Sequence, residues 1–286
     1  MQAGRVEIRD GVTARSILSP TTGFIAEAGF THSLTPARNC TFGCTYCYVP
    51  TMRIQGGLKP EDWQRWGQFT TFKANAADLL CRELRAHQTI YCSPMVDPYQ
   101  PAEEHEHMMP RILEVLLEAP PRVFVLQTRG PLILHDLEQL RALAQCTTLR
   151  VSFSITTNRE EIRRLYEPHC APIAERLDAI RTLRDAGIET YATLAPLLPC
   201  DPEELAFAAL EASGRDLIGD PLHIRTTKPR GGTTRDAAFR VSAANDHQKW
   251  FDPAFQAVVV ECIKRTAYSR GHNFATGPAG FATLAL

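Results

Sequence analysis

Residues 38–48 read Arg-Asn-Cys-Thr-Phe-Gly-Cys-Thr-Tyr-Cys-Tyr, and this stretch holds three of the chain's nine cysteines, Cys40, Cys44 and Cys47. The spacing is C-x3-C-x2-C, and the next cysteine along the chain is Cys81. An odd number of closely spaced cysteines in a chain with no sign of export is poorly explained by disulfides and well explained by a metal centre. Iron–sulfur clusters are usually held by four cysteines, so three predict a cluster with one iron left open. A zinc site and three unligated thiols are the alternatives.

The composition is that of a globular protein with a sizeable core. Hydrophobic residues make up 44% of the 286 residues and charged residues 22%, which is ordinary for a folded chain. Lysine and arginine number 31 against 32 acidic residues, so no global positive field draws the chain onto nucleic acid. Residues 1–19 lack the apolar run of a signal peptide, and no stretch approaches the roughly 18 apolar residues needed to span a membrane. We expect a cytoplasmic protein without membrane contact, in which thiols stay reduced.

Strand and helix patterns alternate along the chain on both sides of the cysteines. The expected strands are residues 30–34, 89–93, 122–127, 149–155, 188–194 and 222–225, and the expected helices are residues 76–84, 104–118, 134–143, 172–186, 202–213 and 253–268. Residues 50–71 have the composition of a loop. This alternation predicts an α/β fold, a partial (β/α)6 TIM-like barrel of parallel strands with N- and C-terminal extensions. Its expected parts are an arm or cap at 1–29, the core at 30–226, and a C-terminal extension at 227–286 that closes the barrel within the same domain.

Polar residues recur where the expected strands end. Examples are Ser93 and Asp97, Thr128 and Arg129, Ser154, and the turn at residues 196–200. Serine or threonine at a strand end often only caps the next helix. In a β/α barrel, however, the loops that follow the strands gather on one face with the active-site groups. The cysteine stretch also follows a strand, so we expect these residues on its face of the barrel.

These motifs together resemble a known superfamily. C-x3-C-x2-C after the first strand of a six-fold β/α chain resembles the radical S-adenosylmethionine (radical SAM) superfamily, and Tyr46 fits the aromatic residue favoured just before the third cysteine. More narrowly, the spore photoproduct lyase-like family is similar over residues 30–48, FTHSLTPARNCTFGCTYCY. Further matches lie in unbroken order between residues 24 and 226, at 97–101, 127–129, 167–168, 176–187 and 195–199.

The resemblance implies a particular cofactor chemistry. Cys40, Cys44 and Cys47 would hold three irons of a 4Fe–4S cluster, and the fourth iron would take the amino and carboxylate groups of SAM. One electron from the reduced cluster would cleave SAM to methionine and a 5′-deoxyadenosyl radical that abstracts hydrogen from the substrate. A reducing partner such as flavodoxin or ferredoxin is implied as the electron source. The protein itself would contribute binding and orientation.

The resemblance also implies which residues bind SAM, namely Tyr46, Ser93, Asp97, Arg129, Ser154, Leu197 and Leu198. Tyr46 would lie by the adenine, and Ser93 by the methionine amino group. Arg129 would pair with the methionine carboxylate, because a guanidinium offers two parallel donors. Ser154 would bind a ribose hydroxyl, and Leu197 with Leu198 would form the apolar wall at the adenine.

Three further cysteines are not cluster ligands on this interpretation. A buried free cysteine is usually a small core residue. Cys92 nevertheless ends an expected strand, near where spore photoproduct lyase carries a hydrogen-donating cysteine, and Cys200 stands where relatives commonly have glycine. We treat Cys92 and Cys200 as catalytic candidates for hydrogen transfer or redox chemistry, and Cys170 as a weaker one.

Local positive charge is concentrated near the C-terminal end of the expected core. Residues 225–240 contain five basic residues and one acid, with Gly231-Gly232 between them. A glycine turn flanked by cations holds phosphate well, so Lys228, Arg230 and Arg235 are candidate ligands of a substrate phosphate. A solvated basic loop is the simpler explanation.

Three functions follow from these patterns. The first is a radical SAM enzyme that acts on a nucleotide-like or other small-molecule substrate. The second is a DNA lesion-repair lyase of the spore photoproduct lyase type, which the near-zero net charge disfavours and the basic loop favours; nucleic acid is therefore a possible but not a favoured partner. The third is a non-catalytic zinc-binding module.

Overall fold

The computed structural model describes residues 7–52, 60–226, 228 and 232–286. Its main sheet has eight strands in the order β2–β3–β6–β7–β8–β9–β10–β11. All neighbours are parallel except β2 and β3. The strands are β2 (Leu18–Pro20), β3 (His32–Leu34), β6 (Thr89–Cys92), β7 (Val123–Thr128), β8 (Thr148–Ser154), β9 (Glu189–Leu197), β10 (Leu217–Pro221) and β11 (Phe274–Thr276). Within the described residues no pairing joins the two edge strands, so the sheet is an open, curved half-barrel, as the sequence predicts.

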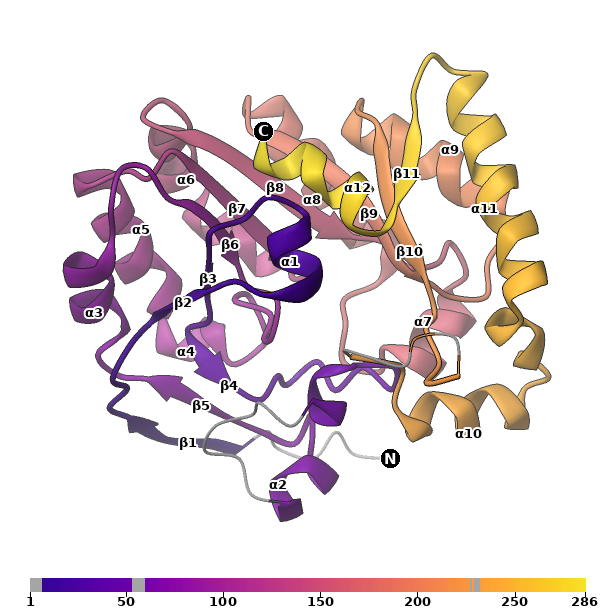
Figure 1. Ribbon diagram of the computed structural model, residues 1–286, viewed down its shortest axis with the longest axis horizontal. Coiled ribbons are helices and arrows are strands. Elements are labelled where there is room, and N and C mark those ends of the chain that lie inside the picture. The colour runs from indigo at the N-terminus through magenta and orange to yellow at the C-terminus, as the bar shows by residue number, and fades with distance from the viewer. Residues whose placement is uncertain (1–6, 53–59, 227, 229–231) are drawn as a thin grey trace.

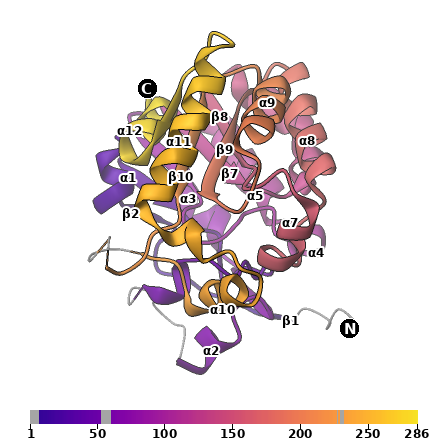
Figure 2. The ribbon, with the colours of Figure 1, turned by 90° about the vertical axis from the view of Figure 1, so that its right-hand side faces the viewer.

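Helices cover both faces of this sheet (Figure 1). The outer face carries α3 (Ala76–Glu83), α5 (Met108–Glu118), α6 (Leu137–Ala144), α8 (Ile173–Asp185), α9 (Pro202–Ser213) and α11 (Pro253–Tyr268). Figure 2 shows α8, α9 and α11 side by side on that face. The concave face is covered by α1 (Gly23–Glu27), α12 (Gly277–Ala282) and the short helix η4 (Thr283–Ala285).

The remaining elements lie in the connections. A second, three-stranded sheet has the order β1–β5–β4 and consists of β1 (Glu7–Val12), β5 (Phe69–Lys73) and β4 (Ala37–Arg38). The other helices are η1 (Val49–Thr51), α2 (Pro60–Gln64), α4 (Glu103–Glu106), η2 (Pro131–Asp136), α7 (Glu160–Tyr166), α10 (Asp236–Ala244) and η3 (Gln248–Phe251). Among the helices that the structure describes, none has the length and apolar character needed to cross a bilayer.

Two buried clusters divide the core. The larger fills the layer between the sheet and the outer helices and extends to the cysteine stretch. The smaller lies inside the half-barrel, where Tyr91, Val125 and Tyr191 meet Phe281 and Leu284 of the C-terminal segment. Residues two apart on a strand share a face, so these clusters identify which side chains point inward.

The last predicted strand was wrong. Residues 222–225 are not a strand, and β10 lies at Leu217–Pro221 instead. Gly214 ends α9 in the left-handed conformation with φ 64°. The chain therefore leaves the helix there, and β10 begins three residues later at Leu217. Gly219, Asp220 and Pro221 are poor strand formers in isolation, and pairing with β9 and β11 overrides that preference.

Other boundaries also differ from expectation. The predicted loop at 50–71 ends in β5, which pairs with β1 and β4, while residues 53–59 lie outside the described part of the chain. The helix expected at 104–118 is divided into α4 and α5 by His107, which is left-handed with φ 51°. The predictions also missed α7, α10 and β11, and β11 adds a seventh parallel strand. The proposed division into arm, core and extension stays a prediction.

Candidate active site

The cysteine stretch forms a buried loop directly after β4. Cys40 and Cys44 are 8% and 7% exposed, and Cys47 is half-buried. Asn39 precedes the first cysteine with φ 64° and Gly43 precedes the second with φ 60°, a conformation that glycine and asparagine adopt most readily. The Asn39 side-chain oxygen accepts hydrogen bonds from the Cys40 amide at 2.7 Å and from the Gly67 amide at 3.2 Å. The left-handed residues Asn39 and Gly43 therefore shape the loop, and the Asn39–Gly67 hydrogen bond attaches it to the segment before β5.

The spread of the three cysteine sulfurs tests whether they could bind a single zinc ion. The Sγ atoms of Cys40, Cys44 and Cys47 do not all lie within 4.8 Å of one another. In a tetrahedral zinc site with Zn–S of about 2.3 Å, ligand sulfurs stand only about 3.8 Å apart. One zinc ion therefore does not fit the three thiols as placed.

Unpaired donors around the loop also fit an acceptor-rich group. Asn39 Nδ2, Thr41 Oγ1 and Gln100 Nε2 are buried and have no hydrogen-bond partner among the described residues. Gln100 is held beside the loop because its Oε1 accepts from the Thr41 amide at 2.8 Å. Buried donors normally have partners, so a bound group rich in sulfide and thiolate acceptors would supply hydrogen-bond partners for these three donors.

A buried ionic network connects the loop to two neighbouring strands. Glu167 is fully buried, and its Oε2 accepts from Arg176 at 2.5 Å. Its Oε1 accepts from Arg129 at 2.6 Å, from the Thr156 hydroxyl at 2.9 Å and from the Tyr46 hydroxyl. Burial opposes ionisation of Glu167, but Arg176 and Arg129 outweigh it and lower its pKa to about 2. The Glu167–Arg176 ion pair thus lies in the same network as Tyr46 of the cysteine loop.

Asp97 and Arg129 meet at the ends of β6 and β7. The Asp97 carboxylate accepts from the Thr128 hydroxyl at 2.6 Å and from the Arg129 amide at 2.9 Å, and the Arg129 Nε lies 3.9 Å from it. Burial raises the pKa of Asp97. Asp97 thus fixes the position of Arg129, whose Nη1 is engaged with Tyr46 and Glu167. Their roles in SAM binding stay predictions.

The serines expected at the cofactor are both buried. Ser93 is 5% exposed and donates to the Thr35 hydroxyl at 3.3 Å. Ser154 follows Ser152 on the inner face of β8; the Ser152 hydroxyl is 2.7 Å from that of Thr193. The Ser154 hydroxyl is buried and has no partner among the described residues. It is therefore available to a ligand.

The Ser154 hydroxyl gives a prediction that separates binding from stability. Ser154→Ala is expected to leave the free energy of unfolding nearly unchanged, because no protein hydrogen bond is lost. Its affinity for SAM should fall about 2- to 10-fold, the effect of one hydrogen bond. Ser152→Ala is the matched control and should cost about 1 kcal/mol, because it leaves the Thr193 hydroxyl unpaired. Urea denaturation measures the change in stability, and equilibrium dialysis of SAM measures the change in affinity. If Ser154→Ala and Ser152→Ala lose equal stability, the Ser154 hydroxyl has a partner within the protein and does not belong to the proposed site.

The apolar residues assigned to the adenine are buried. Leu197 is 3% exposed and Leu198 is 0% exposed, and both belong to the larger core cluster together with Cys40 and Cys44. The half-buried residues beside them, Ala195 and Pro196, are the more accessible part of this turn. The adenine-wall assignment stays a prediction.

The catalytic cysteine candidates lie in different surroundings. Cys92 is fully buried in the larger cluster, on the opposite face of β6 from the inward-facing Tyr91, so its position gives the hydrogen-transfer role no support. Cys200 is half-buried after β9, and burial raises its pKa to about 12. The weakest candidate of the sequence, Cys170, has its sulfur 4.0 Å from that of Cys44.

The basic segment places its three phosphate candidates differently. Arg230 lies outside the described residues. Lys228 Nζ is 5.6 Å from the ring centroid of Phe24 in α1. Arg235 lies near the cysteine loop: burial raises the pKa of Cys47 to about 12, and the charge of Arg235 acts in the opposite direction. Contacts between Thr233 and Thr51 attach this segment to the loop.

Sequence reasoning missed a pair at the end of β10. His223 Nε2 lies 2.7 Å from Asp220 Oδ2, and Asp220 shares the inward face of β10 with Ile218 of the interior core. A carboxylate at the end of a strand could have identified Asp220 from the sequence. It was missed because the strand was predicted at residues 222–225, five residues after the start of β10.

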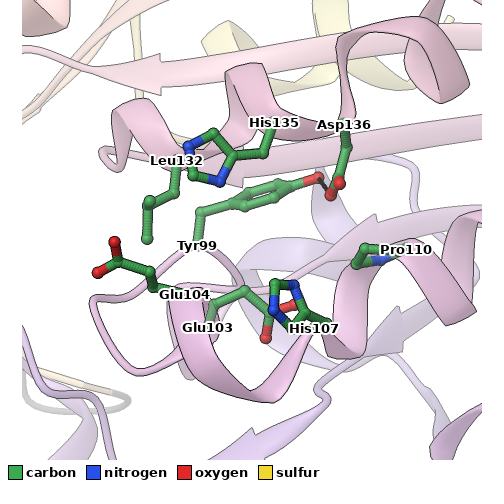
Figure 3. A pocket seen from close by; sticks show the side chains of 8 residues that line it. All are labelled: Tyr99, Glu103, Glu104, His107, Pro110, Leu132, His135 and Asp136. Atoms are coloured by element: carbon green, nitrogen blue, oxygen red, sulfur yellow. Dashed lines mark hydrogen bonds between the residues drawn. The ribbon is translucent and has the colours of Figure 1, made fainter.

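A second cluster of ionisable side chains lies in the segments that follow β6 and β7 (Figure 3). Tyr99 donates to Asp136 at 2.7 Å, and Glu103 accepts from the Met109 amide at 2.5 Å. Burial raises the pKa of Glu103 to about 8. The enclosed space is only about 20 Å³, and its His107 and His135 do not come together with these carboxylates as a metal-ligand set. We interpret this cluster as support for the segment that holds Asp97 and Gln100.

Comparisons with known proteins extend over most of the chain. Residues 34–208 match the sequence family described as the radical SAM superfamily. The uncharacterized protein MJ0683 of Methanocaldococcus jannaschii is 26% identical over 56% of this chain and 58% of its own length. The uncharacterized protein Rv2578c of Mycobacterium tuberculosis is 28% identical over 66% of this chain and 57% of its own length. The chain thus spans less than two thirds of the length of these curated relatives.

Solved structures share the fold. A spore photoproduct lyase variant aligns with a TM-score of 0.63 at 16% identity, covering 94% of this chain and 81% of that one. Spore photoproduct lyase in complex with dinucleoside spore photoproduct aligns with a TM-score of 0.55 at 16% identity, covering 86% and 80%. At this level of identity the likeness concerns the arrangement of strands and helices.

Proposed function

This chain belongs to the radical SAM superfamily, and on that premise we propose that it is an enzyme that uses a 4Fe–4S cluster and SAM to abstract hydrogen from a nucleotide-like or other small-molecule substrate. The observation that carries the proposal is the buried cysteine loop, whose sulfurs are too widely spread for one ion and whose neighbours include three unpaired donors. When bound, the cluster supplies the electron that cleaves SAM to methionine and a 5′-deoxyadenosyl radical.

The chain's own residues hold and orient these groups. Cys40, Cys44 and Cys47 ligate the cluster. Ser154 offers an unpaired hydroxyl toward the barrel interior, and Arg129, fixed by Asp97, offers a guanidinium at the same edge of the sheet. Glu167 pairs with Arg129 and compensates its charge.

Arg235 indicates that the substrate carries an anionic group. It is half-buried, so its charge is poorly hydrated, and it lies near Cys47 at the face where cofactor and substrate would meet. A phosphate or carboxylate on the substrate would compensate this charge. A nucleotide-like substrate fits that requirement.

The cluster assignment is tested by metal analysis and spectroscopy. Protein reconstituted anaerobically should be brown, with iron and sulfide in a ratio of about 4:4. The electron paramagnetic resonance (EPR) signal of the dithionite-reduced protein should change when SAM is added, because SAM would occupy the open iron. Colourless protein with stoichiometric zinc would instead make the chain a zinc-binding module.

The second candidate, a DNA lesion lyase, is supported by the likeness to spore photoproduct lyase bound to its dinucleoside lesion. It predicts DNA affinity that falls steeply with salt, because phosphate contacts release counterions. Fluorescence anisotropy with short DNA between low and moderate salt measures this, and Arg235→Gln should reduce the slope by about one contact. Absence of binding at low salt would exclude the repair function and leave the small-molecule function in place.

A further inference from the structure

Cys170 is a fourth thiol at the cysteine loop. Its sulfur lies 4.0 Å from Cys44 Sγ, and both side chains are buried, at 5% and 7% exposure. The backbone of Cys170 is fixed on both sides, since its amide donates to the Glu167 carbonyl at 3.1 Å and its carbonyl accepts from Arg163 at 3.0 Å. The thiol is therefore held against Cys44 by the same segment that carries the buried ionic network.

Cys44, Cys170 and Glu167 have their ligand atoms within 4.8 Å of one another. A separate metal site is nevertheless unfavourable there. Both carboxylate oxygens of Glu167 already accept hydrogen bonds, from Arg176 on one side and from Arg129 and Thr156 on the other. A cation would have to displace two arginines to reach them. The contact that Cys170 offers is therefore to the sulfur of Cys44.

The outer side of Cys170 faces a groove of about 390 Å³, which Phe42 and His169 also line. Phe42 belongs to the cysteine loop, so this groove lies beside that loop. Cys170 therefore borders the groove and also lies 4.0 Å from the Cys44 sulfur.

We propose that Cys170 is a positioning residue whose S–H group donates a hydrogen bond to Cys44 Sγ in the cluster-bound protein and thereby raises the reduction potential of the cluster. This inference rests on the proposed function. Reduction adds negative charge to the cluster and its thiolate ligands, and a donor beside a ligand sulfur stabilises that charge. Burial of the two sulfurs strengthens the effect, because a hydrogen bond is electrostatically stronger where the surroundings screen charge poorly.

The test is an EPR-monitored redox titration of the reconstituted holoenzyme and three variants. Cys170→Ala is expected to shift the midpoint potential to more negative values at unchanged iron and sulfide content. Cys170→Ser keeps a donor and should restore a potential near that of the parent. Cys262→Ala, which removes a half-buried sulfur from α11, should leave the potential unchanged.

Equal potentials in the parent, Cys170→Ala and Cys170→Ser would overturn the inference while leaving the cluster assignment intact. Reduced iron content in Cys170→Ala would also overturn it, because Cys170 would then be a ligand. A parent protein that binds no cluster at all would refute the proposed function and this inference with it. Cys170→Ser keeps the shape of the side chain and a hydrogen-bond donor, so it gives a potential even if the alanine variant folds poorly.

Discussion

Cys44→Ala protein is expected to be colourless after anaerobic reconstitution, with iron near zero and 5′-deoxyadenosine below detection. The same result is expected for Cys40→Ala and Cys47→Ala. The loop provides only three thiolates, and each substitution removes one of the three iron–sulfur bonds that it can form. Iron and sulfide assays and chromatography of the SAM cleavage products measure the effect.

The control for these variants uses the same substitution elsewhere. Cys81 and Cys146 are exposed cysteines outside the loop, and their alanine variants should load the cluster fully. Burial raises the pKa of Cys47 to about 12, so without metal this thiol is neutral, and binding must release its proton. An unchanged iron content in Cys47→Ala would contradict the assignment of that ligand.

Glu167→Gln is expected to destabilise the protein by about 3–5 kcal/mol, the usual cost of removing one partner from a buried ion pair. Glu167 is 0% exposed and faces two arginines, so the neutral amide leaves their charges uncompensated in a medium that screens poorly. The midpoint of urea denaturation measures the loss. Glu138→Gln breaks an exposed pair with Arg141 and should cost less than about 1 kcal/mol.

The same carboxylate predicts a pH dependence. The pKa of Glu167 is lowered to about 2, so the folded state favours its ionised form relative to the unfolded chain. Its stabilising contribution is complete above the pKa of the unfolded state and is lost as the pH falls toward 2. The stability difference between the parent and Glu167→Gln should therefore shrink in acid; a constant difference would mean that the charge of Glu167 is not what stabilises the network.

Local pattern predicted much of this fold because strands β6 to β9 are rich in apolar and β-branched residues, either in a run as in β7 or in alternation as in β8, and are separated by helical patterns. The failure at β10 has a physical cause: pairing on both sides turns Leu217–Pro221 into a strand despite its glycine, aspartate and proline. Similarly, β5 depends on β1, which lies about sixty residues earlier in the chain. Such contacts are tertiary and leave no periodicity to detect.

In the candidate site, too, the features set by local sequence were predicted and those set by tertiary contacts were not. The spacing of Cys40, Cys44 and Cys47 predicts a metal centre by itself, because all three ligands lie in one loop. The position of Cys170 beside Cys44 depends on how residues 167–170 fold over that loop, 126 residues away in sequence. The Asp220–His223 pair was missed for a related reason, since its strand had been placed incorrectly.

The most direct test of the central claim is to incubate the anaerobically reconstituted protein with dithionite and SAM and to quantify 5′-deoxyadenosine. The account predicts its formation together with methionine, and its loss in the Cys44→Ala protein. A fully loaded cluster that forms no 5′-deoxyadenosine would contradict the proposed radical chemistry.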